Sequence, residues 1–378
     1  MRRLGTVALA LAAAACSTAR GDRSQAPPAT ATTAAVTAPT DEAARDPAIG
    51  STTTEGTITR AFVVSSVDGE TSDAAPKRAR ADQTVTLYAV IVVGDGKTAA
   101  YFTDAPALNV GGKPAVVRPL AEAPAATLRW RKIEPTAQTM SNTESGEFKF
   151  ETISYQATAM PDASGEGAIA ADVHPTLTPD HGNGVGTMRY QIEVAQGDRV
   201  IASPGAEARR GKGSGGLTDD VHRISLRRDD TYLGYLTELY GQPYIWASAG
   251  KTDRTHQSER LEGCDCADFV VYGRRRMGKD IPYTWTGALP EVTKLLAEGD
   301  RAADGVIRDD HGKPLPFTTA GDIILFPRHV GVLTRDVEPI GILDDGDIMM
   351  HSLFDTPKEV AIRDSNYADT HIQLRRWK

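Results

Sequence analysis

Residues 263–278 read GCDCADFVVYGRRRMG, and this stretch decides how the C-terminal part of the chain is interpreted. Its second half has apolar residues at spacings that fall on one face of a helix, and Gly278 ends that helix. Cys266 is therefore expected at the helix N-terminus, where free backbone N–H groups favour a negative charge. We expect a thiol pKa below about 8.5 there, which would supply a nucleophilic thiolate. The alternative is a buried cysteine with a structural role.

The two residues before Cys266 have simpler interpretations. Cys264 forms a Cys-x-Cys pair, but no second cluster of Cys or His accompanies it, so we expect no metal site. In an oxidising compartment Cys264 could close on Cys266, although a bystander thiol is the favoured interpretation. Asp265 is expected to cap the helix.

Composition limits the classes of function. The chain has 378 residues, enough for two domains, and its 40% apolar and 24% charged residues are typical of a soluble globular protein. The net charge of −8 provides no basic surface overall. Nucleic acid is therefore not expected as the main partner.

The N-terminal region has the pattern of an export signal. Residues 1–16 combine a positive start with a short apolar stretch, too short to span a bilayer. They end in Ala-Ala-Ala-Cys, which resembles a bacterial lipobox with Cys16 as the lipidated residue. Secretion with Cys16 irrelevant is the alternative. Residues 17–55 are rich in Ala, Thr, Pro and Ser and are expected to form a disordered tether. We therefore expect an exported protein of the cell envelope, lipid-anchored to a membrane.

Residues 56–228 have the pattern of a β domain. Short runs rich in β-branched residues are separated by turns, and long helical patterns are absent. The expected strands are residues 58–65, 84–93, 115–118, 147–155, 188–194 and 221–226. We predict an all-β, immunoglobulin-like sandwich that acts as a spacer or binding module, with no catalytic constellation of its own.

Residues 229–378 combine expected helices, one of them at about residues 287–298, with a later set of strands, which is an α+β pattern. His329 begins one expected strand, and His351 lies in the next. If these strands pair, both imidazoles can face one side, towards a helix packed on the sheet. A cysteine at a helix N-terminus facing such a histidine is the arrangement of a thiol protease. The histidine takes the thiol proton, and a third group orients the ring.

Five segments in this region carry a resemblance to a known family. They are GQPYIW (241–246), DCADFV (265–270), AGDIILF (320–326), HVGVL (329–333) and IMMHS (348–352). In this order they resemble the NlpC-type family of papain-like cell-wall cysteine peptidases, over roughly residues 229–378. The resemblance implies a papain-like α+β fold without cofactors. It also implies hydrolysis of amide bonds in peptidoglycan stem peptides, often between D-γ-glutamate and a diamino acid.

The resemblance also implies roles for individual residues. Cys266 matches the nucleophile, His329 the general base, and His351 the residue that orients the base. Tyr244 and Asp265 match residues that help to hold the free amine of the stem peptide.

The chain departs from the family pattern on the substrate side. The family has Ser-Gly after the nucleophile, whereas Ala267 and Asp268 stand here. Two alternatives therefore stay open. One is a papain-like hydrolase of another amide or an ester, and the other is a non-catalytic envelope-binding lipoprotein.

Overall fold

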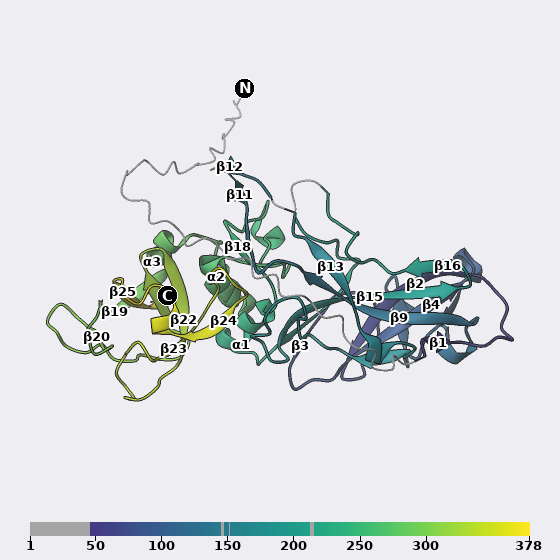
Figure 1. The fold of residues 1–378 in the computed structure, drawn as a ribbon, viewed down its shortest axis with the longest axis horizontal. Coiled ribbons are helices and arrows are strands. Elements are labelled where there is room, and N and C mark those ends of the chain that lie inside the picture. Colours follow the sequence, from purple (N-terminus) through teal and green to yellow (C-terminus); the bar gives the residue numbers. More distant parts are fainter. Residues whose placement is uncertain (1–45, 145–146, 151, 212–214) are drawn as a thin grey trace, which may run out of the picture. The chain divides into compact units, whose positions relative to one another are not determined.

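The structure is a computed structural model that describes residues 46–144, 147–150, 152–211 and 215–378 (Figure 1). The expected signal peptide, Cys16 and most of the tether lie outside the described residues. The last residues assigned to the tether are described, and they already contain strand β1 (Ala48–Ile49), which pairs with β9. Main-chain pairing of this kind needs no large apolar side chains, so composition gave no sign of it.

The fold is mostly β, with 41% of the described residues in strands and 12% in helices. The predicted fold class, a papain-like α+β domain after an immunoglobulin-like sandwich, is therefore wrong. The expected helix at 287–298 shows why. It ends after one turn, α3 (Leu289–Val292), and the chain continues as strand β19 (Thr293–Arg301), which pairs with the last strand, β25. A partner so distant in the sequence leaves no mark on local periodicity.

Helices are few and short among the described residues. They are α1 (Tyr232–Leu236), α2 (Cys266–Arg276) and α3, with 3-10 turns η1 (Gly96–Thr98), η2 (Leu120–Glu122), η3 (Pro161–Ala163), η4 (Thr237–Leu239), η5 (Asp253–Thr255), η6 (Thr286–Ala288) and η7 (Ile362–Asp364). The described part of the chain contains no helix with the length and apolar character needed to cross a membrane.

The first half of the described chain forms two main sheets. One has the order β1-β9-β15-β17-β3, with β13 on β9 and β16 on β15, and the other has the order β14-β4-β5-β8, with β2 on β4. The strands of the first sheet are β1, β3 (Lys77–Arg80), β9 (Ala126–Pro135), β13 (Tyr155–Ala159), β15 (Gly186–Gln196), β16 (Arg199–Ala202) and β17 (His222–Arg227). Those of the second are β2 (Ile58–Val67), β4 (Val85–Val93), β5 (Ala100–Phe102), β8 (Val117–Arg118) and β14 (Ala168–Ala170).

The two sheets share one core, because alternate residues of their central strands point into it. Leu87 and Ile91 of β4 meet Trp130 of β9 and Tyr190 of β15, all of them buried. The polar ends of the two aromatic side chains are satisfied. The Trp130 indole N–H donates to the carbonyl of Glu166 at 2.8 Å, and the Tyr190 hydroxyl donates to the carbonyl of Asp172 at 2.8 Å. Large aromatic rings can therefore be buried here without an unpaired donor.

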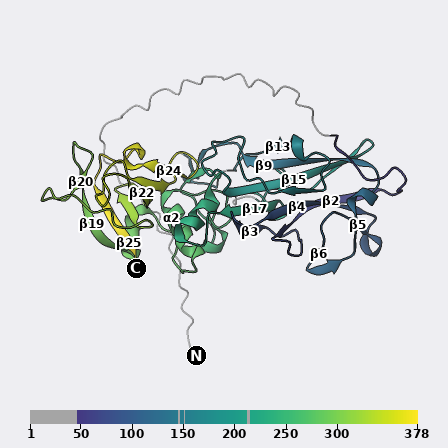
Figure 2. The ribbon, with the colours of Figure 1, turned by 90° about the horizontal axis from the view of Figure 1, so that it is seen from below.

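The last part of the chain forms an antiparallel sheet with the order β20-β19-β25-β21-β22-β23-β24. Its strands are β19, β20 (Ile307–Arg308), β21 (Ile323–Phe326), β22 (His329–Arg335), β23 (Ile348–His351), β24 (Lys358–Ala361) and β25 (Ile372–Trp377). Ile323 and Leu325 pack in the cluster that includes α2, whereas Ile324 and Phe326 pack in a second cluster on the other face. Alternation along one strand therefore supplies two cores. Figure 2 shows α2 beside this sheet, where it contacts β22.

Three small ladders complete the described strands. They are β6 (Leu108–Val110) with β7 (Lys113–Ala115), β11 (Thr143–Glu144) with β12 (Glu147–Phe148), and β10 (Thr139–Ser141) with β18 (Tyr244–Trp246). The last ladder is parallel and crosses the boundary predicted at residue 228. The described residues on both sides of that boundary belong to one compact unit.

A buried carboxylate stabilises the contact between α2 and the first half of the chain. Glu238, in η4, is fully buried, and Arg276 at the end of α2 donates two hydrogen bonds to it at 2.8 and 2.9 Å. Arg227 of β17 lies 3.6 Å away and Arg78 of β3 lies 4.0 Å away, and the Tyr272 hydroxyl also donates. Burial alone would raise the pKa of Glu238, but Arg276 and Arg78 together lower it.

Removal of this carboxylate should destabilise the protein strongly. In Glu238→Ala, Arg276 keeps its charge in a mostly buried place without a counter-ion, whereas Arg227 still pairs with Asp230 at 2.6 Å, and we expect a loss of about 3–5 kcal/mol. Glu359→Ala is the matched control, because Glu359 pairs with Arg228 at the surface, at 3.1 Å. It should cost less than about 1 kcal/mol. The measurement is the free energy of unfolding in urea, and equal losses in the two variants would contradict the assigned role.

Candidate active site

Cys266 is the first residue of α2, as the sequence predicts. The Asp265 carboxylate accepts hydrogen bonds from the backbone N–H groups of Ala267 and Asp268, both at 2.9 Å, and so caps the helix. Gly263 allows the chain to enter this turn, because its φ is +144° and a Cβ there would lie 2.5 Å from the carbonyl oxygen of Pro243. The cap and the glycine together place the Cys266 side chain, which is buried.

The two histidines meet, as expected. His329 is the first residue of β22 and His351 is the last of β23, and these strands pair antiparallel. The distance from His329 Nε2 to His351 Nδ1 is 2.8 Å, within hydrogen-bonding range. His329 is fully buried, and its ring stacks on Tyr367 at 4.9 Å and on Phe326 at 5.9 Å between ring centroids. These contacts hold the ring in one plane.

The two imidazoles do not face α2 directly, which corrects the expected orientation. Val330 and Met350 are the residues of β22 and β23 that pack in the cluster with α2. His329 and His351 are their neighbours in sequence, so they point to the opposite face of the sheet. The histidines lie at the strand ends, and α2 contacts β22, where the Val330 backbone acts to lower the pKa of the Cys266 thiol. Cys266 and His329 therefore belong to elements that pack together, and no hydrogen bond joins the two side chains in the described structure.

One ring nitrogen of His329 is left open. Its Nδ1 has no hydrogen-bond partner among the described residues, Cys266 included, whereas its Nε2 is used by His351. Tyr367 links the two residues: its ring stacks on His329, and its pKa is raised by burial and by the neighbouring Cys266. The open nitrogen therefore belongs to a ring that shares a neighbour with the thiol. Catalytic hydrogen bonds are commonly long or unaligned before substrate binds.

Burial sets the protonation of the pair. Burial raises the pKa of Cys266, and the nearby Asp265 carboxylate raises it further, while the bond from Val330 opposes this. Burial also lowers the pKa of His329, with a second contribution from His351, whose own pKa falls to about 4. The resting site therefore holds a neutral thiol and a neutral imidazole. The expected thiolate with a pKa below 8.5 is not found, because desolvation outweighs the helix N-terminus.

Tyr244 pairs with Cys264, two residues before Cys266. It begins β18 and is almost fully buried, and its ring packs edge-on against Phe354 at 5.4 Å. Burial raises the pKa of its hydroxyl, and Cys266 is the next contributor, so the two groups are neighbours. The hydroxyl has no hydrogen-bond partner within the described ranges. Tyr244 is therefore a protonated donor that remains free to bind a group at Cys266.

A cavity of about 400 Å³ opens next to the start of α2. Asp265 and Asp268 line it, together with His256 and the exposed Trp285. Asp268 is buried, accepts a hydrogen bond from the Ser248 hydroxyl and lies 3.4 Å from His256 Nε2. Burial and Asp265 raise the pKa of Asp268 well above its usual value, and the pKa of Asp265 rises to about 6. With Asp253, the cavity thus has three carboxyl groups and an aromatic wall.

Sequence reasoning did not find every residue of this site. Tyr367 lies beyond the last expected strand, and His256 lies in a loop, so neither had a pattern to mark it. Asp268 was visible as a departure from the family pattern, but its place in a cavity was not. A signal that would have drawn attention to it is its position two residues after the nucleophile on a helix whose first turn is capped.

Cys264 is a free, fully buried thiol, as is expected of a bystander, and burial raises its pKa. It is not bonded to Cys266, which is also free. Its backbone carbonyl accepts a hydrogen bond from the Ser352 hydroxyl at 3.4 Å. In the part of the chain that the structure describes, no group of three or more His, Cys, Asp or Glu side chains could hold a metal ion.

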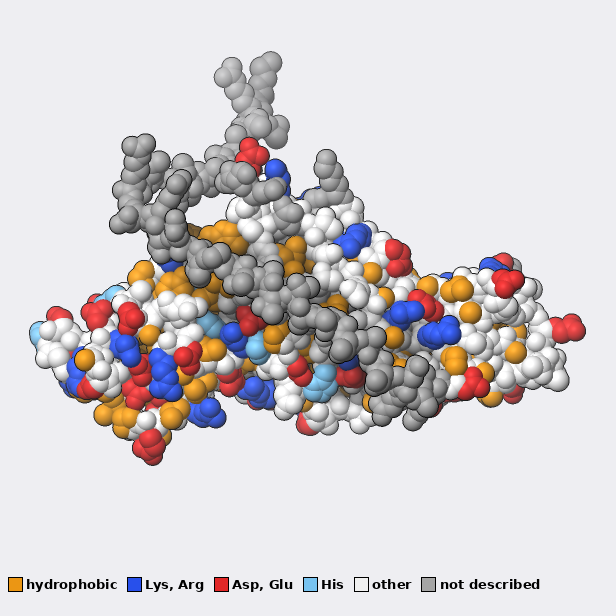
Figure 3. All heavy atoms as spheres, in the orientation of Figure 1, with side chains coloured by type: hydrophobic (Ala, Val, Ile, Leu, Met, Phe, Trp, Pro, Cys, Tyr) orange, Lys and Arg blue, Asp and Glu red, His pale blue; other side chains and the backbone are white. Residues whose placement is uncertain are grey.

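The comparisons with protein-family models, curated proteins and solved structures found no match for this chain. The arrangement of the side chains is therefore the main basis for assigning a function. On the face drawn in Figure 3, basic and acidic side chains of the described residues are intermixed, so this face has no large area of one charge.

Proposed function

We propose that this protein is a cysteine peptidase that hydrolyses amide bonds in peptidoglycan stem peptides. The observation that carries the proposal is the hydrogen-bonded pair of histidines on β22 and β23, because β22 contacts the helix that begins at Cys266. His351 holds Nε2 of His329 at 2.8 Å and leaves Nδ1 open in a fully buried ring. A buried, oriented base with one free nitrogen next to a cysteine at a helix N-terminus is what thiol-based acyl transfer requires.

The chemistry starts from the neutral pair. As the Cys266 sulfur attacks the amide carbonyl carbon, its proton passes to His329 Nδ1, and a C–S bond forms. The carbonyl oxygen gains negative charge, which the Tyr244 hydroxyl is placed to stabilise. The C–N bond then breaks, and the imidazolium gives its proton to the leaving amine. Water attacks the thioester with His329 as base, the acid is released, and the thiol is restored.

The role of His351 follows from the tautomer that this chemistry needs. For Nδ1 of His329 to accept a proton, its Nε2 must carry the hydrogen and donate it to His351 Nδ1. The low pKa of His351, about 4, keeps it neutral and able to accept at neutral pH. His351 therefore positions the base and does not itself touch the substrate.

The cavity beside α2 supports the choice of substrate. The Asp265 carboxyl, with a pKa of about 6, is charged at neutral pH and can bind a cationic group, and stem peptides present free amines. Asp268, whose pKa is raised well above its usual value, stays protonated and can donate a hydrogen bond there. Trp285 provides an apolar wall for the rest of the peptide. Because Asp268 replaces the glycine of the family pattern, a different amide or an ester is the competing substrate class.

The reactivity of Cys266 should increase with pH. A thiol pKa raised by burial leaves little thiolate at pH 7, so alkylation by iodoacetamide should be slow there and rise above about pH 9. Cys264 is fully buried, and the Cys264→Ser variant should show the same profile. The measurement is the mass of the alkylated peptide against time at each pH. A fast rate that is flat below pH 7 would instead indicate a thiolate–imidazolium pair.

Substitutions of Cys266, His329 and His351 should separate the roles of nucleophile, base and positioning residue. Cys266→Ser should abolish turnover, and His329→Ala should lower it by about 10²–10⁴ through loss of the base. His351→Gln should keep more activity than His351→Ala, because an amide can still accept the hydrogen bond from Nε2. Adding His351→Ala to Cys266→Ser should lower the activity little further, since the residues act as a unit.

The assay for these variants is digestion of purified peptidoglycan, with the released fragments identified by mass spectrometry. Cys264→Ser is the control, and it should stay active. Full activity in Cys266→Ser would exclude the peptidase. Absence of released fragments from the parent protein, with hydrolysis of a simple ester, would favour the other substrate class. Absence of both would favour a non-catalytic envelope-binding protein.

We also propose export and lipid anchoring at Cys16, from the composition of residues 1–16 alone. Cys16→Ser should then move the protein from the membrane fraction to the soluble fraction. Its unfolding in urea should be unchanged, because the substitution precedes the described residues. The measurement is immunoblotting of separated fractions. Equal membrane retention of the variant and the parent would refute the anchor.

A further inference from the structure

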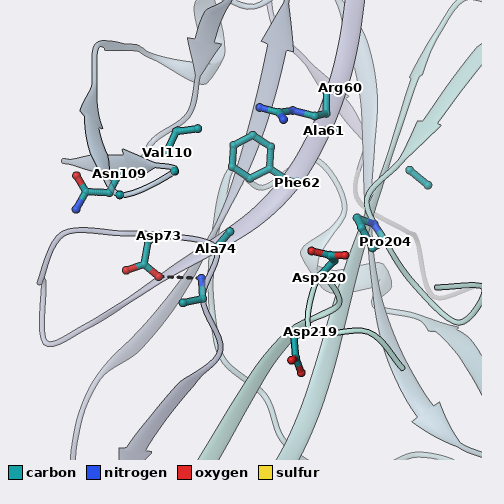
Figure 4. A pocket seen from close by; sticks show the side chains of 14 residues that line it. Arg60, Ala61, Phe62, Asp73, Ala74, Asn109, Val110, Pro204, Asp219 and Asp220 are labelled. Carbon is teal, nitrogen blue, oxygen red and sulfur yellow. Dashed lines mark hydrogen bonds between the residues drawn. The ribbon is translucent and has the colours of Figure 1, made fainter. Parts of the chain in front are cut away.

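A second cavity, of about 760 Å³, lies in the β-rich first half of the chain and shares no lining residue with the cavity next to the start of α2 (Figure 4). Its walls come from β2, from the turn between β6 and β7, from the loop at 73–75, and from the segments that follow β16 and precede β17. Its volume is that of a site for a small molecule or short peptide. Nothing in the proposed chemistry uses it.

The floor of this cavity is apolar and aromatic. Phe62 and Val110 are partly buried and pack on the same hydrophobic cluster. Figure 4 shows the Phe62 ring with Val110 on one side and Pro204 on the other. The guanidinium carbon of Arg60 lies 4.9 Å from the centroid of the Phe62 ring, so the cation is held over the floor.

The cavity also carries opposite charges without partners. Arg60 and Asp220 each have no ion-pair partner among the described residues, and Figure 4 shows them on different sides of the Phe62 ring. The other carboxylates are engaged. Asp73 binds Lys77 at 2.8 Å, and Asp219 lies 3.9 Å from Arg210. A simple cation would be repelled by Arg60, and a simple anion by Asp220, so the site favours a ligand with both charges.

The edge of β2 indicates the chemical class of that ligand. β2 pairs with β4 along one edge. On its other edge only Ser65 is paired, with Asp73, in the part of the chain that the structure describes. Ala61 lines the cavity on this strand, between Arg60 and Phe62, and it is only 2% exposed, but no described main-chain segment pairs with it on this edge. An extended peptide can bind such an edge through its own main chain.

We infer that this cavity binds a short peptide with free ends. The amino group lies towards Asp220, the carboxylate lies towards Arg60, and an apolar side chain lies on Phe62. This inference does not depend on the proposed peptidase activity.

The test is isothermal titration calorimetry of the full-length protein with the tripeptide Ala-Leu-Ala. The Cys266→Ser form is used beside the parent, so that hydrolysis of the probe cannot contribute. We expect saturable binding at micromolar to millimolar concentrations, equal in the two forms. N-acetyl-Ala-Leu-Ala and Ala-Leu-Ala amide, each lacking one end charge, should bind at least about tenfold more weakly.

Variants assign each end of the peptide. Asp220→Asn should weaken binding of the free peptide to the level measured for the acetylated peptide. Arg60→Gln should weaken it to the level measured for the peptide amide. Asp162→Asn and Arg129→Gln are the controls, because both residues are exposed and neither lines the cavity. Ala74→Trp, at an exposed lining residue, should abolish binding by filling the space.

Three results would each overturn the inference. One is no heat of binding up to about 10 mM peptide. Another is equal binding of the blocked and free peptides. The third is unchanged binding in both Asp220→Asn and Arg60→Gln. Loss of peptidoglycan digestion in Cys266→Ser with peptide binding retained would leave both proposals standing, so the two can fail separately.

Discussion

The buried carboxylate of Glu238 is the interaction on which the position of the candidate active site depends. It binds Arg276 at the end of α2 and lies near arginines of β3 and β17. The Asp265 cap fixes the other end of the same helix, immediately before Cys266. A helix held at both ends places the thiol at a set distance from β22. A buried ion pair is costly to desolvate, so its contribution here is better described as fixing one arrangement than as adding stability.

The same burial that fixes the site keeps it uncharged. Cys266, His329 and His351 are all buried, and burial shifts the pKa of each side chain in the direction that favours its neutral form. A neutral pair has lower intrinsic nucleophilicity than an ion pair, but it avoids the cost of two charges in an apolar place. In the proposed reaction, proton transfer therefore accompanies attack on the substrate, when the developing oxyanion and the imidazolium can stabilise each other. Under this proposal, protection of the resting thiol and its activation by substrate have one physical cause.

The sequence predicted the local features of the site well and the fold class badly. The capped helix start at Cys266 and the pairing of the strands with His329 and His351 depend on residues close together in the chain, and both are observed. The helix expected at 287–298 is not observed, because residues 293–298 belong to a strand that pairs with β25, and β25 is far along the chain. The predicted orientation of the two histidines was also wrong, because it depends on where the strands end and on the contact with Tyr367. The roles of these residues remain predictions.

The first half of the described chain contributes directly to the candidate active site. Its strand β10 pairs in parallel with β18, and Thr139 lies opposite Tyr244, which is near Cys266. The next residue after β10, Asn142, donates to the carbonyl of Ala247 at 3.0 Å and to the Gln257 side chain at 2.8 Å. These bonds hold the loop that forms one wall of the cavity at α2. The β-rich half therefore helps to form the cavity that we propose as the substrate site. A change in this half should alter substrate selection as well as stability.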